Sequence, residues 1–362
     1  MIGFHCDNYE NSLNIKNLFE NSVVPNFKSI SEEKKFCGNN IGNLFHRYSG
    51  YDLLKNNDFT YVYPGIEKEK IKNLKLIIMC VANLLDGFSS CEWLYHLLDH
   101  FKNEHFDIPI VIMGVGCQKN IDSKTILHIP DNLKNFFIRF LEKKGNYICV
   151  RGPITLKTFN DNNIYSDKIV VTGCQSILLN KKKNLGEILY KKMKNTTNLK
   201  LVEYPNEKTP IKSKNIIDKY IVNDMSKLYW QFKNNVNSTK LYFDINIKNH
   251  KKFLLEHKFT HCLTPKIHGC NTCLYSEVPV IVIVHDSRLK ELVEMQKYPY
   301  IYYESIKDKE LTNNDISEII DNIIFDFKEF DKNRENLMNK YIEIFKRIGE
   351  LGNVEIKVSL FE

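Results

Sequence analysis

Residues 74–81 read Leu74-Lys75-Leu76-Ile77-Ile78-Met79-Cys80-Val81, a nearly continuous apolar run of the length of a β-strand. Runs that are apolar on both faces are typical of parallel strands covered by helices. Comparable runs span residues 109–113, 146–150, 168–171 and 278–284, with shorter ones at 199–202 and 240–243. Between them lie amphipathic segments of helical length, at residues 44–54, 91–101, 131–143 and 154–160. This alternation predicts an α/β fold with parallel sheets.

The length of 362 residues is typical of two domains. A polar stretch rich in Lys and Asn, at about 180–198, interrupts the alternation and marks the expected junction. We expect one Rossmann-like domain over residues 1–185, a second over 186–312, and helices over 313–362 that pack back across the junction. The economical architecture has the two halves facing each other across a cleft.

The composition, with 43% hydrophobic and 26% charged residues, is that of a soluble globular protein. The longest apolar run, residues 76–85, is shorter than a membrane span of about 20 residues, and residues 1–7 contain no secretory signal pattern. We expect a cytoplasmic protein with at most peripheral membrane contact. The net charge of +7 is spread along the chain without a recognisable nucleic-acid module, so no nucleic-acid partner is expected.

The ten cysteines are mostly isolated, and several lie in apolar runs where a thiol acts as a small hydrophobe. Cys270 and Cys273 have the C-x-x-C spacing, but no second pair follows at a zinc-ribbon distance. We therefore expect reduced thiols and no metal site.

Open α/β sheets bind ligands beyond the carboxyl ends of their strands, so the residues that follow each run are the candidates. A turn containing Asn40, Gly42 and Asn43 precedes the helical segment 44–54, and its amides could face an anion or simply form a turn. Gly114 and Gly116 follow the run at 109–113 without a full G-x-G-x-x-G, so a dinucleotide fingerprint is not supported.

Arg151 follows the run at 146–150 and precedes a helix with Pro153 in its first turn. Its guanidinium could bind a carboxylate or phosphate through two hydrogen bonds, or form an ordinary salt bridge at the sheet edge. The residues alone leave both interpretations open.

The richest candidate segment is Lys266-Ile267-His268-Gly269, where a helix is expected to start near Gly269. The run at 278–284 then ends at His285-Asp286-Ser287-Arg288. A lone histidine is more often structural. A cation, an imidazole and a helix start together nevertheless indicate an anion site with a proton-transfer group.

In this order, the motifs resemble the polysaccharide pyruvyl transferase family over about residues 37–299. The matching segments are Gly38-Asn39-Asn40-Ile41-Gly42-Asn43, Met113-Gly114-Val115-Gly116, Val150-Arg151-Gly152-Pro153, Lys266-Ile267-His268-Gly269 and Val278-Pro279-Val280-Ile281. Phe243-Asp244 and His285-Asp286-Ser287-Arg288 resemble a subgroup in which H-D-S-R follows the last strand.

The resemblance implies a GT-B-like fold of two Rossmann-like domains, with the active site in the cleft. It implies an enzyme that transfers the enolpyruvyl group of phosphoenolpyruvate to a sugar of a surface or lipid-linked glycan, with no further cofactor. Arg151, Lys266 and His268 would be the donor-binding and catalytic positions. The other implied substrate-binding positions are Asn40, Gly42, Asn43, Gly114, Gly116, Gly269, His285, Asp286 and Arg288, of which His285 or Asp286 would receive the acceptor's proton. A homo-oligomer is compatible with the resemblance.

Three departures from the family pattern keep two other hypotheses open. Lys266 replaces the usual Arg, Asn43 stands where an Asp is common, and Cys174-Gln175 replaces an acidic turn. Lysine keeps the charge of Arg but loses its bidentate fork. The first alternative is a GT-B-like glycosyltransferase that uses a nucleotide-sugar. The second is a family member that binds glycan without catalysis.

Overall fold

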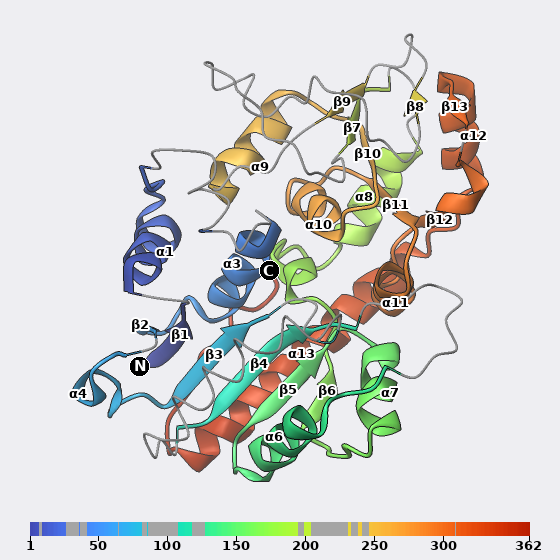
Figure 1. Cartoon of the computed structure of the whole chain (residues 1–362). Coiled ribbons are helices and arrows are strands. Elements are labelled where there is room, and N and C mark those ends of the chain that lie inside the picture. The colour runs from blue at the N-terminus through green and yellow to red at the C-terminus, as the bar shows by residue number, and fades with distance from the viewer. Residues whose placement is uncertain are drawn as a thin grey trace. The chain divides into compact units, whose positions relative to one another are not determined.

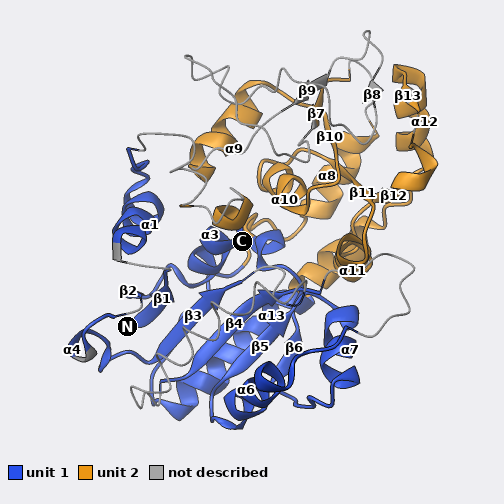
Figure 2. Cartoon of the chain, in the orientation of Figure 1, with its two compact units in different colours: residues 1–26, 46–178, 336–360 blue, residues 27–45, 179–335, 361–362 orange. Residues whose placement is uncertain are grey.

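The structure is a computed structural model with two compact units (Figure 2). Unit 1 comprises residues 1–26, 46–178 and 336–360, and unit 2 comprises residues 27–45, 179–335 and 361–362. The structure describes residues 1–6, 9–26, 36, 42–63, 65–81, 85, 108–117, 127–194, 199–203, 231–232, 238–240, 246–307 and 309–362. The expected domain boundaries at residues 185 and 312, and the facing of two halves across a cleft, stay predictions.

Unit 1 is built on a six-stranded, fully parallel sheet (Figure 1). Its spatial order is β2 (Phe59–Val62), β1 (Ile2–His5), β3 (Leu76–Cys80), β4 (Ile110–Val115), β5 (Tyr147–Val150) and β6 (Ile169–Val171). The apolar runs at 74–81, 109–113, 146–150 and 168–171 correspond to β3 to β6. The expectation of parallel strands is therefore confirmed here, whereas β1 and β2 were not predicted.

Both faces of this sheet are buried, because alternate side chains of each strand point to opposite sides. Ile77, Ile112 and Ile148 form one core with Phe137 of α6 (Asp131–Glu142) and Phe159 of α7 (Pro153–Asp161). On the other face, the buried Tyr341 of α13 (Phe327–Leu351) lies near Cys149. Two helical layers thus explain why the strands are apolar throughout.

Unit 2 contains a five-stranded sheet, which is also fully parallel. Its spatial order is β12 (Tyr300–Tyr302), β11 (Val280–Val284), β10 (His261–Thr264), β7 (Leu201–Glu203) and β9 (Ser238–Lys240). A two-stranded parallel pair, β8 (Gln231–Phe232) with β13 (Glu310–Leu311), lies in the same unit. The predicted strand at 278–284 corresponds to β11, and the α/β class with parallel sheets is confirmed for the described part of both units.

The two sheets share one strand order. Counted along the chain, the strands of unit 2 are arranged 2-1-3-4-5, and unit 1 has the same arrangement with a sixth strand added. In this order the connections leave in opposite directions after the first and third strands, which opens a crevice at the carboxyl ends. The crevice positions are between β1 and β3 in unit 1, and between β7 and β10 in unit 2.

The helices largely follow the sequence pattern. The segments at 44–54, 131–143 and 154–160 correspond to α3 (Gly42–Leu54), α6 and α7, and the charged tail forms α12 (Asn313–Asn322) and α13. The remaining helices are α1 (Tyr9–Asn21), α4 (Lys68–Ile71), α8 (Leu185–Met193), α9 (Ile247–Glu256), α10 (Ile267–Tyr275), α11 (Ser287–Gln296) and the short 3₁₀ turns η1 (Gln175–Leu178) and η2 (Tyr303–Ser305). The expected helix at 91–101 lies outside the described residues.

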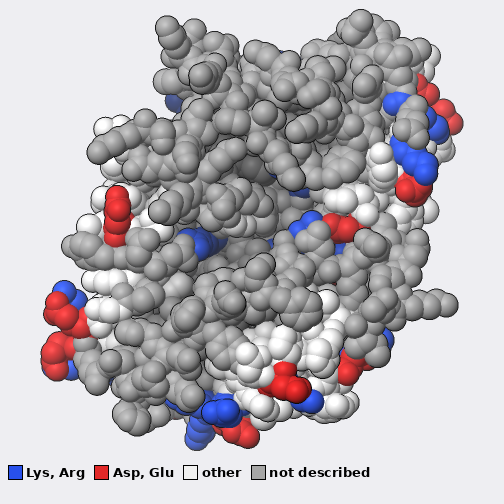
Figure 3. All heavy atoms as spheres, viewed as in Figure 1, with Lys and Arg blue, Asp and Glu red and all other residues white. Residues whose placement is uncertain are grey.

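Among the helices that the structure describes, none has the length and apolar character needed for a membrane span. On the face drawn in Figure 3, the described lysine and arginine side chains lie among acidic ones. The eight cysteines in the described ranges are all thiols, including the buried pair Cys270 and Cys273 in α10.

Candidate active site

The candidate residues are divided between the two units. Gly114, Gly116 and Arg151 belong to unit 1, whereas Lys266, His268, Gly269, His285, Asp286 and Arg288 belong to unit 2, together with Gly42 and Asn43 at the start of α3. Asn40, Phe243 and Asp244 lie outside the described residues. That Arg151, Lys266 and His268 belong to one active site stays a prediction, and each set is described separately.

In unit 1, the end of β4 packs against a histidine that the sequence analysis did not single out. Gly114 has a φ of +80° at an irregularity of the β4–β5 pairing, and a Cβ there would overlap Nε2 of His46. The His46 side chain is 1% exposed and comes from α3. Gln175 Nε2 donates to the carbonyl oxygen of His46 (3.2 Å) and lies 3.4 Å from its Nδ1. Gly114 is therefore required by both backbone conformation and space.

The position of His46 had one sequence signal, its place in a helix that starts at the Gly42-Asn43 turn. That signal is weak, because Leu44, Phe45 and Tyr48 around it are ordinary core residues. Gln175, noted in the sequence only as a replacement for an acidic residue, is the polar partner of His46 in the fold.

Arg151 follows β5, as expected, and its side chain is 1% exposed. A Cβ on Gly116 would lie 2.9 Å from the Arg151 Cδ atom, so the glycine makes room for the guanidinium stem. Next to it, the amide of Cys117 donates to Thr155 Oγ1 (3.1 Å) in α7. Arg151 thus lies buried just beyond the carboxyl ends of β4 and β5. A ligand would have to enter this buried region to contact the guanidinium group.

In unit 2, the candidate segment forms the start of α10, directly after β10 at the crevice position of the sheet. Lys266 is the N-cap residue and its amide donates to Thr264 Oγ1 (3.1 Å), while His268 and Gly269 occupy the first helical turn. The helix starts two residues before Gly269. No side chain of the described residues caps it, whereas Asn246 caps α9 and Asp286 caps α11. Backbone amides and a lysine at one helix start favour an anion.

A second polar group follows the neighbouring strand β11. Asp286 Oδ1 accepts from the amide of Leu289 (2.8 Å) and caps α11, while Oδ2 accepts from Arg288 Nη2 (2.8 Å) and lies 3.5 Å from His285 Nε2. Burial is the largest effect on the pKa of His285 and lowers it. The neighbouring Asp286 raises this pKa, and Arg288 lowers it. The His285 imidazole is therefore neutral near pH 7 and able to accept a proton.

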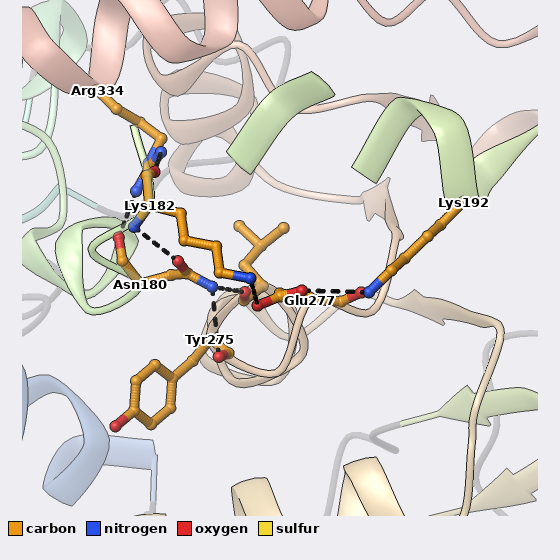
Figure 4. A network of polar contacts seen from close by, with 7 residues as sticks. Asn180, Lys182, Lys192, Tyr275, Glu277 and Arg334 are labelled. Atoms are coloured by element: carbon orange, nitrogen blue, oxygen red, sulfur yellow. Dashed lines mark hydrogen bonds and ion pairs between the residues drawn. The ribbon is translucent and has the colours of Figure 1, made fainter. Parts of the chain in front are cut away.

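Buried polar contacts fix the orientation of α10. Thr272 Oγ1 donates to the carbonyl oxygen of His268 (2.8 Å), and the Tyr298 hydroxyl donates to Asn271 Oδ1. At the other end, Asn180 Nδ2 donates to the carbonyl oxygens of Leu274 (3.1 Å) and Tyr275 (3.5 Å), as Figure 4 shows.

Asn180 is held in turn by the fully buried Arg334, which donates to the carbonyl oxygens of Asn180 and Lys182. Polar contacts thus hold α10 near both of its ends, and they fix the position of its first turn.

The unit 2 set combines a cation, helix-terminal amides and two imidazoles at adjacent strand ends. Such a set can bind a phosphate or carboxylate group and can transfer protons. Within the described part of the chain, no three His, Cys, Asp or Glu side chains are grouped so as to hold a metal ion.

No family model and no curated protein matches this chain. Among solved structures, it is similar to the wall teichoic acid polymerase TagF, at a TM-score of 0.36 and 9% sequence identity. That alignment covers 98% of this chain and 87% of the other. A TM-score and a sequence identity this low give no information about the function of this chain.

Proposed function

We propose that this chain is a transferase that moves the enolpyruvyl group of phosphoenolpyruvate onto a sugar of a surface or lipid-linked glycan, where it closes as a pyruvate ketal. The observation that carries the proposal is the start of α10, where Lys266 precedes the first helical turn, His268 lies in that turn, and no side chain of the described residues caps the helix. Phosphoenolpyruvate carries a phosphate and a carboxylate, and cationic side chains and helix-terminal amides bind both groups. The order of motifs described in the sequence supports the same donor.

In the proposed reaction, a sugar hydroxyl adds to C2 of phosphoenolpyruvate as C3 receives a proton. The C2–O bond to phosphate then breaks, and a second hydroxyl of the sugar closes the ketal with loss of its proton. Lys266 and the amides of α10 would hold an anionic group of the donor, and His268 would deliver the proton to C3. His285, neutral and paired with Asp286, would receive a hydroxyl proton. Arg151 remains the proposed second donor-binding position.

The direct test is the release of inorganic phosphate from phosphoenolpyruvate in the presence of glycan acceptors. General acid–base groups contribute about 10²–10⁴-fold to a rate. His268→Asn, which keeps a similar shape but cannot shuttle a proton, should lower turnover at least about 100-fold. The variant should keep most of the rise in melting temperature that phosphoenolpyruvate causes, because binding relies on Lys266 and the amides.

A matched control is His257→Asn, which changes a histidine at the end of α9 and should leave turnover unchanged. A folded His268→Asn protein with near-normal turnover would contradict the proposed role of the imidazole. Stabilisation by nucleotide-sugars but not by phosphoenolpyruvate would favour a glycosyltransferase. If no phosphate is released with any of the acceptors tested, the result would favour the non-catalytic binding protein that the three sequence departures suggest.

A further inference from the structure

A pocket of about 450 Å³ opens in unit 2 at the amino ends of β10 and β11. It is lined by the last turn of α8, the end of α9, the end of α10 and the residues that lead into the two strands. Lys266 and His285 follow the opposite, carboxyl ends of the same strands. The pocket is therefore separate from the candidate active-site residues of this unit.

The pocket has an apolar interior. Phe259, Val278 and Pro279 are buried residues that line it, and Leu255 at its edge is 52% exposed. A leucine exposed to this extent beside a concave surface offers contact area to an apolar group. Pockets of this volume are typical of small-molecule sites.

The charged lining is basic, with Lys191, Lys192 and Lys258 against one carboxylate, that of Glu277. Burial raises the pKa of Glu277, whereas hydrogen bonds from Lys182 and Lys192 lower it. The net result is a pKa below its usual value, so the carboxylate is ionised near pH 7. Figure 4 shows Glu277 between these two lysines, at 2.6 Å from Lys182 and 3.4 Å from Lys192. The acid is thus already neutralised.

Lys191 forms a salt bridge with Glu187 (2.7 Å) within α8. Lys258 differs, because its ammonium group makes no hydrogen bond or ion pair with any residue that the structure describes. The pocket therefore combines an apolar interior with a lysine whose charge no acid among the described residues balances.

We propose that this pocket binds a small amphiphile, in which a phosphate group contacts Lys258 and Lys192 and an apolar chain lies against Leu255 and Phe259. A sugar phosphate would leave the apolar lining uncovered, and a neutral chain would leave the ammonium group of Lys258 without a counter-charge from the described residues. The same chemistry occurs in the head-group region of an anionic lipid and in a soluble phosphate ester of an alcohol.

The test uses the full chain and three compounds: octyl phosphate, inorganic phosphate and octyl glucoside below its micelle concentration. Leucine methyl groups labelled with ¹³C report the location of binding, with the Leu255 signal assigned by its loss in Leu255→Met. We expect octyl phosphate to shift the Leu255 methyl signals and to bind at least tenfold more tightly than either other compound. Calorimetry gives the affinities.

Lys258→Asn removes the charge, and asparagine tolerates the left-handed backbone (φ 51°) of this position. It should weaken octyl phosphate binding about two- to fivefold, the size of one partly exposed ionic contact. Lys252→Asn in the preceding helix α9, with a side chain 74% exposed and outside the pocket lining, is the control and should change nothing.

The proposal would be overturned if octyl glucoside bound as tightly as octyl phosphate. It would also be overturned if Lys252→Asn weakened octyl phosphate binding as much as Lys258→Asn, or if octyl phosphate left the Leu255 methyl signals unchanged. Sedimentation with phosphatidic acid vesicles but not phosphatidylcholine vesicles, lost in Lys258→Asn, would identify a lipid head group as the source. Octyl phosphate binding without sedimentation would identify a soluble ester. Both of these last outcomes support the shared chemistry.

Discussion

His46 and Gly114 form a buried contact that leaves no room for a side chain at residue 114. A side chain at residue 114 would have to adopt a positive φ and also displace the His46 ring, which is 1% exposed. We expect Gly114→Ala to lower the free energy of unfolding by about 2–5 kcal/mol, from about 1–2 kcal/mol of backbone strain plus about 1–3 kcal/mol of overpacking. Urea unfolding of the two proteins measures the difference.

Gly65→Ala is the matched control, because Gly65 has a similar φ of +84° but nothing within 4 Å of the place of its Cβ. It should cost only the strain, about 1–2 kcal/mol. If the two variants were equally destabilised, the contact with His46 would not be what restricts residue 114.

The candidate residues of unit 2 could be predicted from sequence, because each follows an apolar run directly. Lys266 and Asp286 occupy the N-cap positions of the helices that follow β10 and β11, and the Asp286 side chain accepts a capping hydrogen bond. His46 could not be predicted, because its role depends on a pairing with Gln175, 129 residues away along the chain. A residue whose polar contacts come from distant parts of the chain leaves no pattern in the sequence around it.

At the scale of elements, α10 depends on the loop that contains Asn180. The Asn180 side chain donates to the last carbonyl groups of the helix and accepts from the Lys182 amide (3.1 Å). We expect Asn180→Ala to destabilise the protein by about 1–3 kcal/mol, because buried carbonyl groups lose their donor while the backbone contact with Arg334 is kept. Thermal or urea unfolding checks this value.

The control in the same network is Glu277→Gln (Figure 4), which removes the charge that faces Lys182 and Lys192. These pairs are partly exposed, so their loss should cost less than about 1 kcal/mol. A larger effect for Glu277→Gln than for Asn180→Ala would show that charge, not the buried amide, holds the helix end.

Most elements were predictable where an apolar run or an amphipathic segment is long enough to show its period. β3, β4, β5 and β11 are examples, and so are α6 and α7. Strands β1 and β2 are as long as β5, but Gly3 and His5 in β1 and Thr60 in β2 interrupt their apolar residues, so no continuous apolar run marks them. Strand β12 has three residues, two of which are tyrosines. The start of α10 differed by two residues from the expectation, because the helix begins at Ile267, directly after the N-cap residue Lys266.

At the scale of the whole molecule, the shared strand order of the two sheets was not visible in the sequence. Strand order is set by which edges pair, and the pairing of β1 with β3 joins residues about 75 positions apart. Local periodicity carries no information on such pairing. The sequence therefore predicted the fold class, and the structure supplies the crevice positions that make Lys266 and His268 a candidate site.

Whole-molecule stability should depend on pH through buried histidines. Burial lowers the pKa of His250 to about 3, and it lowers the pKa values of His261 and His285 in the same direction. Between a free histidine's pKa of about 6.5 and these lower values, the unfolded chain binds more protons than the folded one. This contribution to stability is thus complete above about pH 6.5 and is lost as the pH falls.

For His250 alone, the free energy of unfolding should fall by about 1.4 kcal/mol between pH 7.5 and pH 5.5, a range in which most carboxylates stay ionised. Urea unfolding at three pH values measures this slope, and His250→Gln should make it shallower by that amount whatever its effect on stability at pH 7.5. His128→Gln, at an exposed histidine, is the control and should keep the slope of the natural sequence. A His250→Gln protein with an unchanged slope would mean that His250 is protonated in the folded chain, and its burial would then require a compensating acid beside it.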